Sequence, residues 1–150
     1  EIDFTAGKVS QKSKNNPTKV EEIKYILDAT TTDATPEEVF IDGDGGTERM
    51  TIPLETSWLF SIDIVARSTS NSTNAWRYEG VIYNTNTGFV SFSPGGGDGI
   101  QETIFVGGVG GWDVALAADN TNDALTITVT GDPVFTVRWG IKVTILQVTE

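Results

Sequence analysis

The long run of residues 112–148 alternates apolar and polar side chains almost without interruption. Successive side chains of a β-strand point to opposite faces of a sheet, so this alternation predicts strands that each bury one face. The pattern breaks only at DNTND (119–123) and at GDP (131–133), and these breaks divide the run into three antiparallel strands. No catalytic set of side chains stands at the outward positions. The run therefore predicts a fold class but no reaction.

The same period of two recurs along most of the chain. It is clearest in the segment WLFSIDIVA (58–66), in which every second residue from Trp58 is apolar and is predicted to point inward. Clusters of Gly, Asn, Ser, Thr and Pro separate nine or ten such segments, and none has the period of an amphipathic helix. We therefore expect an all-β protein, an antiparallel β-sandwich of jelly-roll type with an extended N-terminal arm.

The composition excludes most of the common catalytic and metal-binding chemistries. The 150 residues include no cysteine and no histidine, which excludes disulfides, zinc sites with thiolate or imidazole ligands, and Ser-His or Cys-His pairs. Any bound metal would need oxygen ligands, as calcium and magnesium do. Because no nucleophile stands next to a base, we expect no cofactor and no enzymatic activity.

The charge and hydropathy of the chain exclude two further classes of function. The sequence holds 10 basic and 21 acidic side chains, a net charge of -11, and an acidic surface repels the phosphates of nucleic acids. Its apolar stretches are a few residues long, far short of the roughly 18 that a helix needs to cross a bilayer. We expect no nucleic acid partner and no insertion into a membrane.

Residues 1–19 differ in charge from the rest of the chain. This segment holds four lysines and two acidic residues, whereas residues 20–150 hold six basic and nineteen acidic ones, so the two parts carry +2 and −13. We expect an N-terminal arm or linker over 1–19 and a β-sandwich domain over 20–150. An arm of opposite charge can lie on a neighbouring copy, although a loose chain end is the simpler interpretation. The residues of this predicted subunit contact are Ile2, Phe4, Lys8, Val9, Lys12, Lys14 and Lys19.

A weak calcium candidate lies in the sequence DGDGGTE (42–48). The carboxylates of Asp42, Asp44 and Glu48 follow one another along a glycine-rich turn and could converge on one hard cation. The segment lacks the length and the flanking helices of an EF-hand loop. Asp-Gly is also a strong hairpin signal, so we favour a simple turn and expect no metal site.

Two carboxylates lie in the middle of predicted strands, where the catalytic pair of a glycosidase could lie. They are Asp63 and Glu79. Arg67, Arg77 and Arg138 take comparable outward positions, so cross-strand ion pairs explain the carboxylates more simply than catalysis does. We therefore predict no catalytic residues.

Aromatic side chains are the remaining resource for binding. Trp76, Tyr78, Tyr83 and Trp112 are candidates for a surface that stacks on sugar rings or on a partner protein. Core packing is favoured for the other two tryptophans, which fall in phase with aliphatic neighbours. For Trp76 and Tyr83 both interpretations stay open.

Five segments of the chain form a recognisable ordered set. They are ATTTDATPEEVFIDGDGGTERMTIP (29–53), WLFSIDIVARS (58–68), YEGVIYN (78–84), WDVALAADNTNDALTITVTG (112–131) and TVRWGIKVTILQV (136–148). In this order they resemble the β-rich module that recurs in virion proteins of tailed bacteriophages, notably tail-fibre and capsid-decorating proteins. The likeness covers about residues 29–148.

The resemblance implies a non-enzymatic structural protein on the exterior of the virion, acting in assembly, stabilisation or host contact. It further implies a homotrimer or larger assembly, with other virion proteins as partners and a host-surface glycan as a further candidate. Two alternatives stay open. One is an extracellular filament subunit in which residues 2–9 complete the sheet of the next copy. The other is a carbohydrate-binding module that uses exposed aromatic residues.

Overall fold

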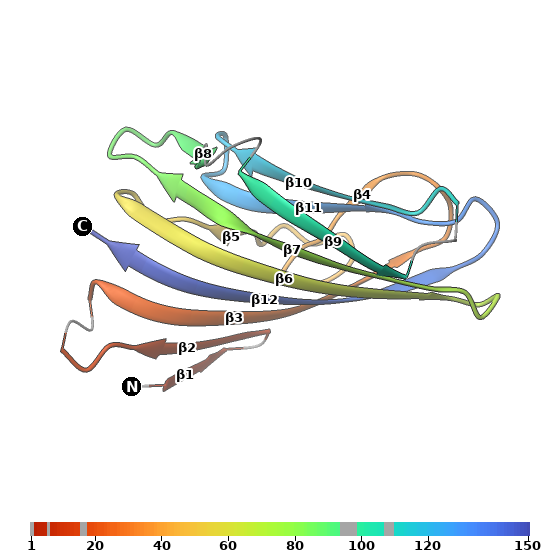
Figure 1. The fold of residues 1–150 in the computed structure, drawn as a ribbon, viewed down its shortest axis with the longest axis horizontal. Coiled ribbons are helices and arrows are strands. Elements are labelled where there is room, and N and C mark those ends of the chain that lie inside the picture. Colours follow the sequence, from red (N-terminus) through yellow and green to blue (C-terminus); the bar gives the residue numbers. More distant parts are fainter. Residues whose placement is uncertain (1, 6, 16–17, 94–98, 107–109) are drawn as a thin grey trace.

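The computed structural model describes residues 2–5, 7–15, 18–93, 99–106 and 110–150, with the backbone alone for 2–5 and 106. This part of the chain contains twelve strands and no helix, and every pairing between strands is antiparallel (Figure 1). It therefore contains no helix of the kind that could span a membrane. The expected all-β, sandwich-like fold is confirmed, and the structure does not test the finer jelly-roll description.

The strands form two sheets. In the eight-stranded sheet the order is β1-β2-β3-β12-β6-β7-β8, and β9 also pairs with β7. In the four-stranded sheet the order is β10-β11-β4, and β5 also pairs with β11. The larger sheet consists of β1 (Ile2–Thr5), β2 (Lys8–Lys12), β3 (Val20–Thr31), β6 (Thr56–Ser68), β7 (Thr73–Asn84), β8 (Val90–Phe92), β9 (Ile100–Val106) and β12 (Val137–Thr149). The smaller sheet consists of β4 (Glu37–Glu38), β5 (Met50–Thr51), β10 (Asp113–Asp119) and β11 (Ala124–Thr130).

The long strands of the larger sheet bury every second side chain. In β6 the positions predicted to point inward, from Trp58 to Ala66, are at most 2% exposed. The register carries this alternation across the sheet, since Ile141 of β12 lies between Leu27 of β3 and Ile64 of β6, and all three are buried. One face of the sheet therefore belongs to the core, and the other, here called the outer face, points away from the smaller sheet.

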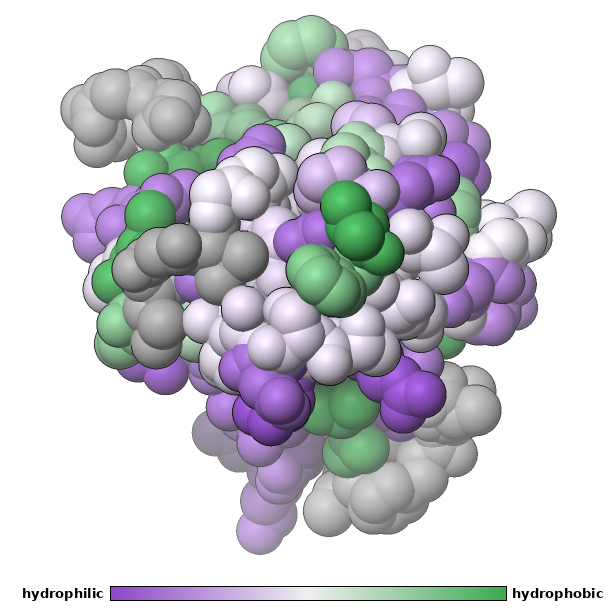
Figure 2. Space-filling view, turned by 90° about the vertical axis from the view of Figure 1, so that its right-hand side faces the viewer, coloured by the Kyte–Doolittle hydropathy of each residue, from purple (hydrophilic) through white to green (hydrophobic). Residues whose placement is uncertain are grey.

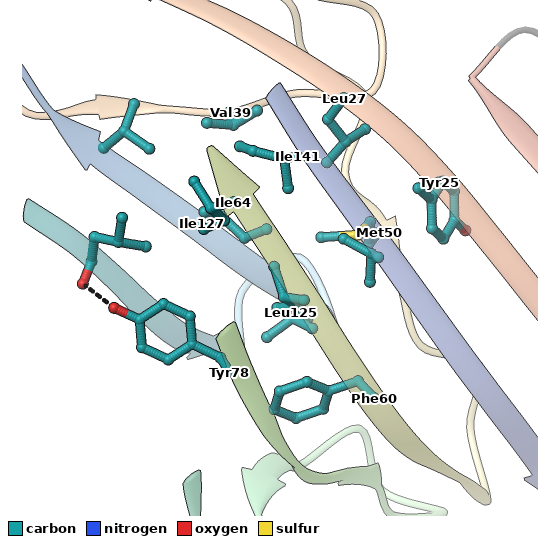
Figure 3. Close-up of a cluster of buried hydrophobic side chains, with 14 of the residues drawn as sticks. Tyr25, Leu27, Val39, Met50, Phe60, Ile64, Tyr78, Leu125, Ile127 and Ile141 are labelled. Carbon is teal, nitrogen blue, oxygen red and sulfur yellow. Dashed lines mark hydrogen bonds between the residues drawn. The ribbon is translucent and has the colours of Figure 1, made fainter. Parts of the chain in front are cut away.

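The core is a single apolar cluster to which both sheets contribute (Figure 3). Met50 of β5 and Leu125 of β11 lie in the same cluster as Phe60 of the larger sheet. One hydrogen bond also joins the two sheets, because the Tyr78 hydroxyl on β7 donates to the carbonyl oxygen of Val114 on β10 at 3.4 Å. Burial of this cluster is what holds the two layers face to face.

The three strands expected in residues 112–148 are present, but they divide between the two sheets. β10 and β11 form a hairpin in the smaller sheet, whereas β12 lies in the larger sheet between β3 and β6 (Figure 1). The loop from Gly131 to Thr136 makes this crossing, and its Asp132 carboxylate accepts the N–H groups of Val134 and Phe135. Alternation of side chains predicts which face of a strand is buried, but not the sheet to which the strand belongs.

The N-terminal segment continues the chain's own larger sheet. β1 pairs with β2, and β2 pairs with β3 over five positions, from Lys8 opposite Tyr25 to Lys12 opposite Glu21. Ser10 is buried, and the Lys8 ammonium lies 5.9 Å from the centre of the Tyr25 ring. The side chains predicted for Ile2 and Phe4 lie outside the described residues. The domain boundary at residue 19 and a contact of this segment with a neighbouring copy stay predictions.

Deletion of residues 1–12 is expected to lower the free energy of unfolding by about 1–2 kcal/mol. Five cross-strand positions, at a few tenths of a kcal/mol each, disappear with β2, and the edge of β3 is uncovered. Urea denaturation followed by circular dichroism measures the loss. A truncated chain as stable as the full one would show that the pairing of β2 adds nothing to the fold.

Candidate functional site

The acidic turn of residues 42–48 is closed by its own hydrogen bonds. The Asp42 carboxylate accepts the N–H groups of Glu48 at 2.9 Å and Thr47 at 3.0 Å, and these bonds hold the pKa of Asp42 below its usual value. The Asp44 carboxylate accepts the N–H of Thr30 at 3.1 Å. Within the described ranges no three acidic side chains gather in a way that could hold a metal ion. Asp42 and Asp44 thus stabilise the loop by accepting hydrogen bonds from backbone N–H groups.

Three of the four aromatic candidates for surface contact are buried. Trp76, Tyr78 and Trp112 are 4–7% exposed, so the structure does not place them on the surface. Trp76 stacks on Trp139 with ring centres 5.7 Å apart, and Trp112 lies against the same ring at 6.1 Å. The reason is the phase of β7, in which Trp76 and Tyr78 alternate with the outward Arg77. Tyr83 keeps its surface position, partly exposed on the outer face.

One of the two mid-strand carboxylates, Asp63, forms ion pairs with basic residues of the adjacent strands. Asp63 lies 2.6 Å from Arg77 Nε and 3.2 Å from Lys142 Nζ. The hydrogen bond from Arg77 is the main cause that lowers the pKa of Asp63. A carboxyl group held in its charged form is poorly suited to act as a general acid near neutral pH. Glu79 is exposed on the same face of the sheet.

The outer face differs strongly in charge from the opposite side of the molecule. Residues 32–54 and 111–136, which form the smaller sheet and its loops, hold ten acidic side chains and one basic side chain. The outer face is nearly balanced, with five basic and four acidic side chains. The basic ones are Lys24, Arg67, Arg77, Arg138 and Lys142, and the acidic ones are Glu22, Asp28, Asp63 and Glu79.

A groove of about 620 Å³ crosses this face over β3, β12, β6 and β7. Gly140 and Ala75 form its floor, and the exposed side chains of Ile26, Val65 and Phe105 form its walls. The ion pairs of Asp63 close one end, where the Arg77 guanidinium also lies 5.4 Å from the centre of the Phe105 ring. An apolar trough with a few fixed polar groups is the usual form of a small-ligand site.

An apolar patch lies on the same face, toward the end of β12. Leu146 of β12 is the cross-strand neighbour of Leu59 on β6, which in turn faces Val81 on β7. Val148 and Tyr83 flank Ser57 in the next row. Leu59, Leu146 and Val148 are about half exposed, at 57%, 48% and 51%. These five residues, Leu59, Val81, Tyr83, Leu146 and Val148, are called the apolar patch below.

A smaller apolar spot lies in the loop between β11 and β12. Val134 is 75% exposed and Phe135 is 43% exposed. Figure 2 looks onto the end of the sandwich that carries this loop, and hydrophobic side chains stand there among side chains of intermediate hydropathy. Two adjacent apolar residues of this kind are common on monomeric proteins, whereas a contiguous set such as the apolar patch is a candidate site of interaction.

The sequence signals for the groove and the patch were present but weak. An unbroken β-strand pattern contains Gly140, and the end of β12 carries apolar residues on both faces, including Leu146 and Val148. Neither site can be assembled without the register of four strands. Sequence reasoning therefore missed both.

Comparison with known proteins shows a likeness to a solved structure. No protein-family model matches the sequence, and no curated protein matches it. The crystal structure of the tailspike protein gp49 of the Acinetobacter baumannii bacteriophage Fri1, a capsular polysaccharide depolymerase, is similar with a TM-score of 0.50 and 14% identity. The match covers 95% of this chain and 20% of the tailspike chain, so this chain spans about a fifth of that protein's length. At this identity the likeness shows the fold alone.

The comparison corrects one expectation. The sequence led us to expect a protein without enzymatic activity, whereas the similar chain belongs to a depolymerase, which is an enzyme. That expectation is therefore contradicted, and the absence of histidine and cysteine gives no ground for excluding catalysis. The fold of this chain is one that also occurs in part of a phage tailspike.

Proposed function

We propose that this chain is a module of a phage tail-associated protein on the virion exterior, and that it assembles with further copies of itself through the apolar patch. Two findings support the phage assignment. The sequence segments resemble tail-fibre modules, and the fold is similar to part of a tailspike. The expected assembly is a homotrimer, with neighbouring tail proteins as further partners.

The observation that carries this proposal is the apolar patch together with the charge around it. The patch contains no charged residue, in a chain whose net charge is -11. Two acidic copies repel one another wherever their acidic sides approach, so association costs least where charge is absent or balanced. The outer face meets this condition, and burial of Leu59, Leu146 and Val148 against a second copy supplies the driving force.

Replacing Leu59 and Leu146 together by glutamate is expected to convert the assembly to monomers. The two new carboxylates would have to be buried in the interface without partners. Light scattering after size-exclusion chromatography measures the native mass, and circular dichroism shows whether the strands are retained. The matched control adds the same two charges at Val134 and Phe135 and should keep the wild-type mass. A monomeric wild-type protein, or a double variant that assembles normally, would rule out the patch as the interface.

A second candidate function is contact with a polysaccharide of the host surface, and the groove favours it. Phe105 offers an exposed ring, and Asp63 and Arg77 offer a fixed acceptor and donor beside it. Sugars present both apolar ring faces and hydroxyl groups, and the tailspike of similar fold is described as a capsular polysaccharide depolymerase. Electrophoresis through gels that contain host capsular polysaccharide tests for binding. A parallel assay for new reducing ends separates binding from cleavage.

A further inference from the structure

We propose that the groove binds an acidic stretch of polysaccharide and that Gly140 keeps its floor open. This inference rests on the second candidate function, contact with a host polysaccharide, and goes further by naming the site and the charge of the ligand. It is independent of assembly through the apolar patch, because the polar row of Ser61 and Thr144 separates the two regions on the outer face.

Gly140 leaves the floor of the groove without a side chain. The residue lies within the thirteen-residue strand β12, where glycine costs roughly 0.5–1 kcal/mol relative to alanine. Its φ angle is not in the left-handed region, and an added Cβ would meet Val65 Cγ1 at 3.7 Å, an ordinary contact. Neither backbone conformation nor space therefore requires glycine here. A glycine inside a strand often marks a place where a ligand or another backbone approaches closely.

A pair of arginines lies in the row of the sheet beyond one end of the groove, next to the residues that line it. Arg138 of β12 and Arg67 of β6 are directly opposite one another, and both are exposed on the outer face. Like charges at opposite cross-strand positions destabilise a sheet. Arg67 donates a hydrogen bond to the amide oxygen Oδ1 of Asn71 at 3.1 Å, and this acceptor carries no charge. An anionic group between the two guanidinium groups would relieve their repulsion.

Two further cations line the opposite end of the groove. Arg77 and Lys142 lie there, and Lys142 is four residues along β12 from Arg138, which corresponds to roughly 13 Å of strand. Arg77 and Lys142 line the groove together with the two carboxylates of Asp28 and Asp63, so the charges of the lining itself balance. Arg67 and Arg138, in the row next to the lining, add two positive charges. On the other side of the groove, the charges of Lys24 and Glu79 cancel. This excess of two positive charges is opposite in sign to the whole chain, and an extended anion is needed to reach both ends.

The chemistry of the groove favours a sugar chain over a nucleic acid or an acidic peptide. Val65 and Phe105 provide apolar surface for sugar ring faces. The Asp28 carboxylate is a hydrogen-bond acceptor for donors such as sugar hydroxyls, which acidic side chains do not supply, whereas Asp63 is already paired with Arg77 and Lys142. Both carboxylates repel a strand with a phosphate at every residue. A polysaccharide with carboxylates on separated sugars satisfies both sets of groups.

Affinity electrophoresis tests this site with three polymers. We expect alginate, a carboxylated polysaccharide, to retard the wild-type protein, and neutral dextran and polyglutamate to leave its mobility unchanged. Retardation should weaken as salt is added. Retardation by dextran alone would overturn the charge assignment, and retardation by polyglutamate would favour a peptide ligand. Failure of the wild type to bind alginate, dextran or capsular polysaccharide would remove the second candidate function along with the groove.

Two variants locate the site. Gly140→Val should fill the floor and weaken alginate binding tenfold or more, while the melting temperature stays the same or rises. Thr144→Val is its control on the same strand and face, outside the groove. Arg138→Gln should also weaken binding, whereas Lys12→Gln, with the same change of charge, should not. If Gly140→Val and Arg138→Gln bind alginate as the wild type does, the groove inference is wrong although polysaccharide contact stands.

Discussion

Replacing Trp139 by alanine is expected to lower the free energy of unfolding by about 3–5 kcal/mol. This side chain is 2% exposed and packs between Trp76 and Trp112, with ring centres 5.7 and 6.1 Å away. Its indole N–H also donates to Thr31 Oγ1 at 3.0 Å, so the substitution leaves a buried hydroxyl without this partner. A cavity of indole size in a packed core is the main cost.

Urea denaturation measured by far-ultraviolet circular dichroism gives the change in unfolding free energy. The near-ultraviolet spectrum reports on the three tryptophans and should change together with it. Val134→Ala is the control, since that side chain is 75% exposed and its truncation should change stability by less than about 0.5 kcal/mol. A Trp139→Ala protein that unfolds at the wild-type urea concentration would show that the tryptophan cluster does not anchor the core.

Replacing Gly131 by alanine is expected to destabilise the fold by about 2–3 kcal/mol, because the new methyl group has no room. Its Cβ would run into Thr31 Oγ1 and lie 2.9 Å from Thr31 Cβ and 3.2 Å from the Asp33 carbonyl oxygen. Thr31 is fully buried, and its hydroxyl accepts the indole N–H of Trp139. A shift of the Thr31 side chain would therefore also disturb the packing of the three tryptophans.

The same urea experiment on a double variant isolates the clash. Combining Gly131→Ala with Thr31→Ala should cost less than the sum of the two single substitutions, because the hydroxyl that obstructs the methyl group is then gone. Gly110→Ala is the matched control, since an added Cβ there would have no neighbour within 4 Å. Strict additivity of the Gly131 and Thr31 effects would contradict the proposed contact.

Sequence reasoning predicted the faces of the strands well. The inward positions of β6 and β12 follow from alternation, because burial of one face is a property of each strand alone. The crossing of β12 into the larger sheet and the pairing of β2 with β3 could not be predicted in this way. In both cases a strand pairs with a strand that is distant in sequence or could have paired elsewhere. The alternation within a strand does not indicate which sheet edge it will pair with.

The candidate sites were harder to predict for the same reason. Ile26, Val65, Phe105 and Gly140 come from four strands that are far apart in sequence, and only the register of the sheet brings them together. Three of the four aromatic candidates, Trp76, Tyr78 and Trp112, are buried, because alternation along a strand does not tell which of its faces meets the smaller sheet. Charge was more informative, since it predicted a cross-strand ion pair of Asp63 with Arg77 on the outer face, although not the second pair with Lys142.

The central position of β12 has a consequence for the order of folding. β12 pairs along its length with both β3 and β6, although it follows every other described strand in the chain. During synthesis, the edges of β3 and β6 that pair with β12 therefore lack their hydrogen-bond partners until residues 137–149 have been made. Such closure between remote segments is slow, on the order of milliseconds to seconds, and the waiting intermediate is the state most prone to pair with the wrong chain.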